Sequence, residues 1–295
     1  MGNTDTEAQD RLTGIGPNFI GIGVQKCATS WLHEILHAHR DIFTSEPKEI
    51  DFFTANYDRG YEWYRRHFAD AAGTVARGET SPSYFYNPGV PERIHAFDPN
   101  IRLLVIFRDP VERAYSNHLH EVRANHITSS EHFEDGLLNN PCYIDQGRYA
   151  THLTRWLDTF PTEAILPLIF EEIVSEPESS VRTVYNFLGV DPAGKFDNSR
   201  KSSNQSVAYR RPGLQKVMQK GGNALRRSGF GHGLERIKSF PPIKKIMDLN
   251  RQNLRHTVPA LLPETRKRLE AEFTPEIDAL AKMLGRKSLP WSRNS

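Results

Sequence analysis

Short apolar runs that alternate with helical patterns limit the folds open to this chain more than any other feature of its sequence. Three runs have the length and apolar character of buried strands: Phe19–Gly23, Ile101–Phe107 and Ala164–Ile173. A helical pattern follows each of them, and Asp109 with Pro110 is a typical N-cap and first position for the second helix. Strands alternating with helices predict an α/β domain with a central, mostly parallel sheet flanked by helices.

The domain is predicted to extend to the C-terminus. Apolar residues return at helical spacing near the end of the chain, at Leu269, Phe273, Ile277, Leu280 and Leu284. We therefore expect one domain over residues 17–295, preceded by a flexible tail over residues 1–16. Within this domain the segment 207–261 is strongly basic, with twelve Lys and Arg between residues 209 and 255 against two acidic residues. It is either a mobile basic flap over an anionic site or a solvated helical excursion.

Composition excludes several classes of protein. The net charge of +2 gives no reason to expect a nucleic-acid partner. Two cysteines are too few for a disulfide scaffold, which favours a reducing compartment. No run approaches the ~20 apolar residues that a membrane span requires, so we expect a cytoplasmic protein without an integral membrane segment.

The stretch "FIGIGVQKCATSWLHEIL" predicts an anion site between the first strand and its helix. Unpaired N–H groups and the positive end of a helix dipole meet there, and Lys26, Thr29 and Ser30 add one cation and two hydroxyls. The order differs from a P-loop, because Lys26 precedes the small residues and no Gly-Lys pair exists. The third glycine of a dinucleotide-binding fingerprint is also missing.

Several stretches of the chain resemble the sulfotransferase family. The stretch from Lys26 to Trp31 resembles its 5′-phosphosulfate loop, in the order lysine, two small residues, threonine, serine and tryptophan. The stretch "RLLVIFRDPVERAYSNHLHEVR" resembles its 3′-phosphate motif. The stretches "EPKEIDFF", "GETSPSYF", "GRYATHLTRW" and the final "LPW" are similar to the branch that acts on heparan-type carbohydrates. The resemblance implies the sulfotransferase fold and a donor, 3′-phosphoadenosine-5′-phosphosulfate (PAPS), that leaves as 3′-phosphoadenosine-5′-phosphate (PAP). By analogy with phosphoryl transfer, no metal is expected.

The resemblance also implies which residues bind the donor. The loop at Lys26 would hold the 5′ end, Arg108 and Ser116 would hold the 3′-phosphate, and Trp31 would lie near the adenine unless it is simply part of the core. A late loop could close over the 3′-phosphate or be a solvated turn. The full set is Lys26, Cys27, Ala28, Thr29, Ser30, Trp31, Arg108 and Ser116, with Arg200, Lys201 and Ser202 in the late loop.

Three residues are candidates for the chemistry. Glu49 would take the proton of the acceptor as it attacks, and Lys26 would stabilise the leaving phosphate. His120 falls where the N-sulfating heparan enzymes carry a functional histidine. Glu49 could instead belong to a surface charge cluster with Glu46 and Lys48, and His120 could be a surface histidine.

The acceptor is predicted mainly from the heparan-type motifs, which favour a carbohydrate; a lipid or a small natural-product alcohol is the alternative. Two positions depart from the family pattern: Ala28 replaces a common glycine, and Thr80 stands where the heparan enzymes usually carry lysine. Two other classes of protein are alternatives to an enzyme of this family. A non-catalytic nucleotide- or anion-binding module would keep Lys26 and Arg108 without needing Glu49. A P-loop kinase would need magnesium.

Overall fold

The apolar runs predicted as strands lie side by side in one parallel sheet. The computed structural model describes residues 16–193, 207–209, 251–253 and 257–292. Five strands follow the order β2-β3-β1-β4-β5, and every neighbouring pair is parallel. The strands are β1 (Phe19–Gly23), β2 (Ile42–Thr44), β3 (Ala76–Thr80), β4 (Arg102–Phe107) and β5 (Ile165–Ile169). The predicted α/β fold with a central parallel sheet is confirmed.

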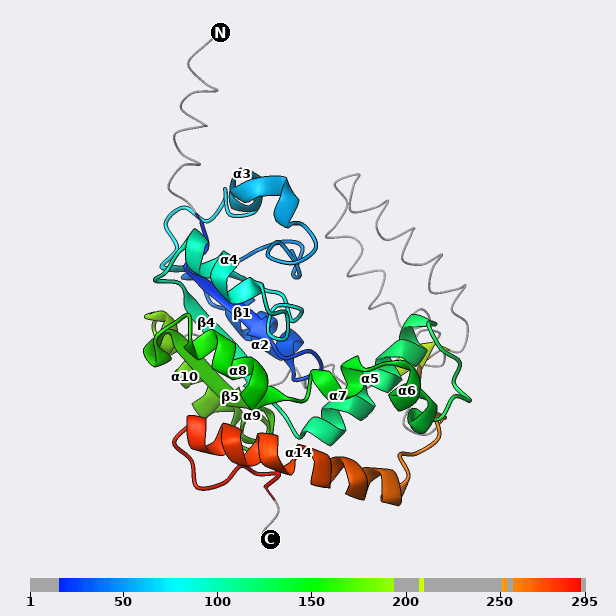
Figure 1. The fold of residues 1–295 in the computed structure, drawn as a ribbon. Coiled ribbons are helices and arrows are strands. Elements are labelled where there is room, and N and C mark those ends of the chain that lie inside the picture. The colour runs from blue at the N-terminus through cyan, green and yellow to red at the C-terminus, as the bar shows by residue number, and fades with distance from the viewer. Residues whose placement is uncertain (1–15, 194–206, 210–250, 254–256, 293–295) are drawn as a thin grey trace. The chain divides into compact units, whose positions relative to one another are not determined.

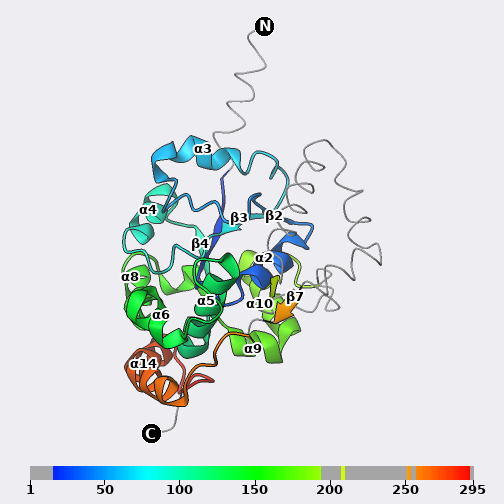
Figure 2. The same cartoon turned by 90° about the vertical axis from the view of Figure 1, so that its right-hand side faces the viewer.

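Helices cover both faces of this sheet. Figures 1 and 2 show α2 and α10 on one face and α4 and α8 on the other, while α14 packs on α8. The helices of this unit are α2 (Thr29–His37), α3 (Gly60–Arg66), α4 (Val90–Phe97), the start of α5 (Pro110–Ala124), α7 (Cys142–Asp145), α8 (Tyr149–Leu157), α9 (Phe170–Ser175), α10 (Pro177–Leu188) and α14 (Pro263–Met283), with short 3-10 turns η1 (Tyr57–Arg59) and η2 (Thr162–Ala164). A parallel sheet covered on both faces buries its strands, as their apolar sequences require.

The central strand β1 packs closely against its neighbour β3. All five of its residues are buried, and a Cβ added to Gly21 would lie 2.7 Å from Oγ1 of Thr80. Thr80 is itself only 1% exposed. The close approach of the two strands therefore requires glycine at position 21.

The prediction of a strand over the whole third apolar run, Ala164–Ile173, is wrong in its second part. Strand β5 ends at Ile169, and the second half of the run forms helix α9 instead. Pro167 is tolerated because β5 is an edge strand, so one side of it needs no backbone partner. Gly189 ends α10 in the left-handed conformation, as the sequence predicts.

The chain divides into two compact units. The first comprises Met1–Ala114, Pro141–Asn204 and Pro263–Ser295, and the second comprises Tyr115–Asn140 and Gln205–Leu262. In the second unit lie the remainder of α5, helix α6 (Phe133–Asn139) and the antiparallel pair β6 (Val207–Tyr209) and β7 (Arg251–Asn253). The extent of a single domain over residues 17–295 stays a prediction.

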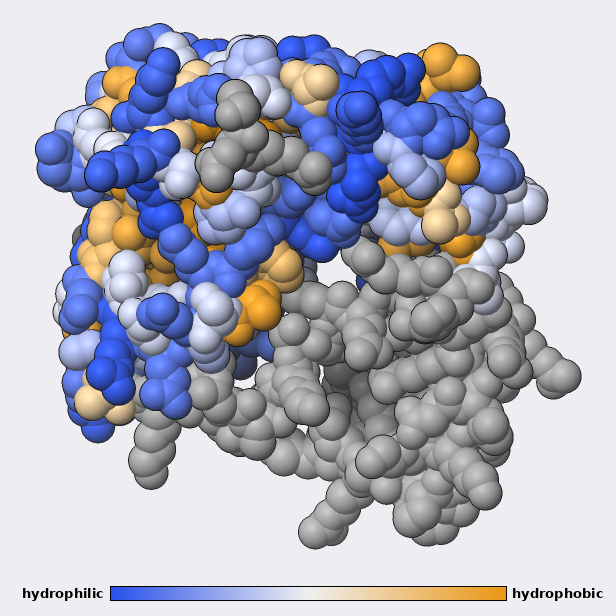
Figure 3. Space-filling view, turned by 90° about the horizontal axis from the view of Figure 1, so that it is seen from below, coloured by the Kyte–Doolittle hydropathy of each residue, from blue (hydrophilic) through white to orange (hydrophobic). Residues whose placement is uncertain are grey.

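The surface of the described residues exposes few large apolar side chains. These are Val75, Leu138, Val174 and Leu262. Figure 3 shows a mostly hydrophilic face with apolar areas scattered between polar ones. Among the described residues, no helix has both the length and the apolar character needed to cross a membrane.

Candidate active site

Two loops of the first unit begin at the carboxyl ends of adjacent central strands. Strands β3 and β2 lie on one side of β1, and β4 and β5 lie on the other, so the sheet grows in opposite directions from the β1–β4 pair. Ligands of open parallel sheets bind outside the strand ends at such a point. The loop after β1 carries Lys26, and the loop after β4 begins with Arg108. The topology therefore brings the two predicted anion-binding loops to one edge of the sheet.

The loop after β1 turns sharply through two left-handed residues. Lys26 has φ 70° and Ala28 has φ 67°, and the N–H of Cys27 donates to the carbonyl of Val24 at 3.1 Å. Left-handed residues turn successive N–H groups toward one point, as in backbone anion nests. Ala28 adopts this conformation although it lacks the freedom of glycine, at a cost of roughly 1 to 2 kcal/mol.

The first turn of α2 presents donors without partners. In the described part of the chain, the N–H groups of Ala28, Thr29, Ser30 and Trp31 donate no hydrogen bond, and no side chain caps the helix. Ser30 is exposed, Thr29 is 7% exposed, and Trp31 packs in the core at 6% exposure. Four free N–H groups at the positive end of a helix form an anion site. The anion site predicted from the sequence would lie at this helix terminus, and it stays a prediction.

Cys27 takes part in this loop through its backbone and not as a nucleophile. Its side chain is fully buried, and burial raises the pKa of the thiol to about 12. The Sγ atom lies 3.9 Å from the hydroxyl of Tyr149, which donates to the carbonyl of Arg108 at 2.9 Å. Tyr149 thus joins the loop after β1 to the loop after β4, a link that sequence analysis missed.

Arg108 reaches directly into the first loop. Its Nη1 donates to the carbonyl of Lys26 at 3.3 Å, and its guanidinium lies over the ring of Phe170 at 4.7 Å. A longer contact of 3.8 Å joins Nη2 to the carboxylate of Glu112. These contacts hold the guanidinium beside the first loop.

The residue after Arg108 starts helix α5 as predicted. The Asp109 carboxylate accepts hydrogen bonds from the N–H groups of Val111 at 2.8 Å and Glu112 at 3.0 Å. The N–H of Asp109 in turn donates to Glu171 at 3.2 Å, and burial raises the pKa of Glu171. The cap and this contact fix the direction in which the chain leaves β4.

A buried arginine adds positive charge beneath the site. Arg113 is 0% exposed and donates to the side chain of Gln146 at 3.1 Å and to the carbonyls of Cys142 and Tyr143. Within the described ranges no carboxylate pairs with it, and burial lowers its pKa. The charges of Arg113 and Arg108 both act on the thiol of Cys27 and lower its pKa against the larger effect of burial. The loop at Lys26 therefore lies in a positive field that the sequence pattern did not reveal.

Glu49 lies in the segment that follows β2 at the same edge of the sheet. Its side chain is 49% exposed and forms an ion pair with Lys48 at 2.9 Å. His33 of α2 lies close enough to feel the charges of Lys48 and Glu49, and burial lowers the pKa of His33 to about 4. The segment with Glu49 therefore lies near the helix that carries the anion-binding loop, and His33 is a neighbour that sequence analysis missed.

The remaining predicted residues lie in other parts of the chain. Ser116 and His120 belong to the part of α5 in the second unit, where both are half-buried and Arg123 donates to Nδ1 of His120 at 2.7 Å. The late loop with Arg200, Lys201 and Ser202 lies outside the described residues. So do the tail 1–15 and most of the basic segment 207–261.

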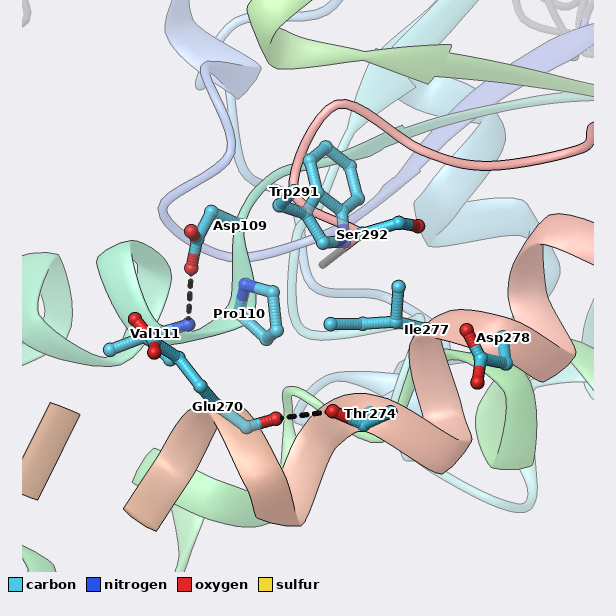
Figure 4. Close-up of a pocket in the computed structure, with 9 residues that line it drawn as sticks. All are labelled: Asp109, Pro110, Val111, Glu270, Thr274, Ile277, Asp278, Trp291 and Ser292. Atoms are coloured by element: carbon cyan, nitrogen blue, oxygen red, sulfur yellow. Dashed lines mark hydrogen bonds between the residues drawn. The ribbon is translucent and has the colours of Figure 1, made fainter. Parts of the chain in front are cut away.

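A small pocket beside the start of α5 differs in character from the anion-binding loops (Figure 4). Side chains of α14 and the final "LPW" stretch line it, including Glu270, Asp278 and Trp291, together with Asp109. Its charged lining residues are acidic, which does not suit an anionic donor. Among the described residues, no group of three or more His, Cys, Asp or Glu side chains is placed to hold a metal ion.

Comparison with known protein families identifies the family to which this chain belongs. Residues 17–236 match the sulfotransferase domain family, so the chain belongs to that family, whose donor is PAPS. A sulfotransferase from Alicyclobacillus acidocaldarius shares the fold, with a TM-score of 0.69 at 24% identity over 94% of this chain and 99% of that one.

Curated relatives are heparan sulfate enzymes. The bifunctional heparan sulfate N-deacetylase/N-sulfotransferase 2 of Bos taurus is 33% identical over 204 residues, which cover 62% of this chain and 22% of the relative. The heparan sulfate glucosamine 3-O-sulfotransferase 6 of Mus musculus is 35% identical over 184 residues, covering 59% of this chain and 52% of the relative. The chain thus spans between about a fifth and about half of the length of these two relatives.

Proposed function

We propose that this protein transfers a sulfuryl group from PAPS to a hydroxyl or amine of an acceptor. The observation that carries the proposal is the pairing of two anion-binding loops, in which Arg108 donates to the carbonyl of Lys26 beside four unpaired N–H groups. A donor with charge at both ends of its adenosine needs two such loops. Membership of the sulfotransferase family supports the same reading.

The residues present fit this donor. Lys26 and the free N–H groups of α2 would hold the 5′ end, where Lys26 neutralises the charge that develops on the leaving phosphate. Arg108 would hold the 3′-phosphate through charge-assisted hydrogen bonds. Ser116 is proposed for the same phosphate from the sequence resemblance. When bound, PAPS supplies the sulfuryl group and leaves as PAP. Arg200, Lys201 and Ser202, proposed for the 3′-phosphate, complete the proposed site.

Glu49 is the proposed general base. An acceptor hydroxyl is a poor nucleophile at neutral pH, so a carboxylate within hydrogen-bond reach must take its proton. The exposed carboxylate of Glu49, next to Lys48, is accessible to such an acceptor at the edge where the loops meet. His120 is a proposed secondary group.

A carbohydrate is the proposed acceptor. The names of the relatives, the heparan-type motifs and the basic segment 207–261 support it. A lipid or a small natural-product alcohol is the alternative outcome of an acceptor panel. We propose the cytoplasm as its location, supported by the two free cysteines, Cys27 and Cys142.

The test replaces Glu49 by glutamine, which keeps the shape of the side chain and removes the base. With labelled PAPS and a panel of sugars, lipids and small alcohols, we expect the rate of transfer to fall by roughly 10² to 10⁴, while affinity for PAP stays near that of the wild type. Glu46→Gln is the control, because Glu46 is an exposed carboxylate of the same segment with no proposed role.

The outcomes separate the parts of the proposal. Near-normal transfer by Glu49→Gln would mean that Glu49 is not the base and belongs to a surface charge cluster with Glu46 and Lys48. Binding of PAP without transfer to any acceptor in the panel supports the non-catalytic nucleotide-binding module instead.

A further inference from the structure

A buried carboxyl group at the end of β3 has no part in the chemistry proposed above. Glu79 is 1% exposed and accepts four hydrogen bonds. Its Oε1 accepts from the hydroxyls of Tyr84 at 2.7 Å and Tyr64 at 3.1 Å. Its Oε2 accepts from the hydroxyl of Ser81 and from the N–H of Ile50 at 3.4 Å. In the described part of the chain, no Lys, Arg or His side chain bonds to it.

Three of these hydrogen bonds connect Glu79 to the segment that carries Glu49, one directly and two through a hydroxyl group. The N–H of Ile50, the next residue, donates to Glu79 directly. The hydroxyl of Ser81 donates to Glu79 and accepts the N–H of Asp51 at 3.0 Å. Glu79 therefore holds the two backbone N–H groups that follow Glu49, one of them through a relay.

Tyr84 forms a second relay of the same kind. Its hydroxyl donates to Glu79 and accepts the N–H of Phe53 at 3.3 Å. A hydroxyl has only one hydrogen to donate, so the carboxylate sets which way it points and leaves its lone pairs for the backbone. The hydroxyl of Tyr64 on α3 donates a hydrogen bond to Glu79, and the structure shows no hydrogen bond from this hydroxyl to the segment after Glu49.

The arrangement suits a carboxylate and not a carboxylic acid. A carboxylate only accepts, which matches four donors, whereas a protonated carboxyl must donate to one of the surrounding hydroxyls. That hydroxyl would have to turn its own hydrogen away from Glu79. Where it is Ser81 or Tyr84, the carboxyl would no longer fix the orientation of the hydroxyl that accepts from Asp51 or Phe53. The ionisable side chains that face Glu79 are Tyr64 from α3 and Tyr84 from the segment after β3, and burial raises the pKa of both phenols.

We propose that Glu79 is a positioning residue for Glu49: as a carboxylate it orients Ser81 and Tyr84, fixes the backbone from Ile50 to Phe53 and so directs Glu49 toward the acceptor. This inference rests on the proposed function of Glu49. Burial raises the pKa of Glu79 to about 7, so the switch between the two states falls near neutral pH.

The test compares Tyr84→Phe with Tyr64→Phe. Both remove one fully buried hydroxyl from Oε1 of Glu79, but only Tyr84 relays to the backbone after Glu49. We expect kcat to fall at least about tenfold in Tyr84→Phe and much less in Tyr64→Phe, with affinity for PAP unchanged in both. Equal losses in the two variants would overturn the proposal, because a merely structural role treats the two hydroxyls alike.

Two further measurements complete the test. Amide hydrogen exchange in the peptide that covers residues 50–53 should be faster in Tyr84→Phe than in Tyr64→Phe, and this result needs no catalytic activity. Equal exchange would count against the relay even if the protein proved not to transfer sulfuryl groups. In active protein, the acidic limb of the kcat profile near pH 7 should disappear in Glu79→Gln, and persistence of that limb would exclude Glu79 as its source.

Discussion

Replacement of Glu79 by glutamine should change how the free energy of unfolding depends on pH. The wild-type side chain is fully buried, and burial raises its pKa from 4.5 to about 7, against the hydrogen bonds from Ser81, Tyr84 and Tyr64 that lower it. The folded protein therefore binds this proton more tightly than the unfolded chain does. Glutamine cannot bind it in either state.

The size and sign of the effect follow from this difference in pKa. At roughly 1.4 kcal/mol per pKa unit, protonation of Glu79 stabilises the folded state by about 3 kcal/mol. This contribution is fully present below about pH 4.5 and is lost as the pH rises through about 7. The stability of the wild type relative to the variant should thus decline with rising pH.

Denaturant unfolding of both proteins between about pH 5 and about pH 8.5 measures the effect. Subtracting the variant from the wild type removes the titration of all other groups, if those groups behave alike in the two proteins. Over this range the difference in unfolding free energy should fall by roughly 2 to 3 kcal/mol. A constant difference would refute the reasoning, because it would mean that Glu79 titrates equally in the folded and unfolded states.

Three other predictions concern the loops and the basic segment. Arg108→Ala should weaken PAP binding by roughly 1.5 to 3 kcal/mol in calorimetry, with a smaller effect on adenosine monophosphate, and equal losses for both nucleotides would contradict a separate 3′-phosphate site. Ala28→Gly should raise the free energy of unfolding by about 1 kcal/mol, because glycine adopts φ near 67° without strain, whereas a loss of stability would contradict this account. If segment 207–261 guides an anionic acceptor, raising the ionic strength from about 0.05 to about 0.5 M should raise the KM of that acceptor more than that of a neutral analogue; equal responses would leave the segment without this role.

Local patterns in the sequence were enough to predict the framework of the site. The run Phe19–Gly23 forms β1 as predicted, and Asp109 caps α5 with Pro110 in its first turn. The order of residues around Lys26 predicted a strand, a loop and a helix N-terminus. These features depend on neighbours a few residues apart, so composition and spacing reveal them.

Strands without a clear pattern were missed. Strands β2 and β3 are three and five residues long, and β3, "ARGET", contains more polar than apolar residues. Their strand conformation comes from pairing with β1 and with each other. Propensity over so few residues is a weak signal, and tertiary pairing overrides it.

The sequence by itself determined which groups the chain offers to an anion: Lys26, the N–H groups of the first turn after it, and Arg108 beyond a second strand. Only the tertiary structure decided how they are held. Cys27 and Tyr149 are 122 residues apart in sequence, and Glu79 reaches the backbone beside Glu49 across the sheet edge. Burial then changes the pKa values of these groups. Removal from water raises the pKa of the Cys27 thiol to about 12 and brings the pKa of Glu79 close to 7. Burial and contacts between distant segments arise only when the chain has folded.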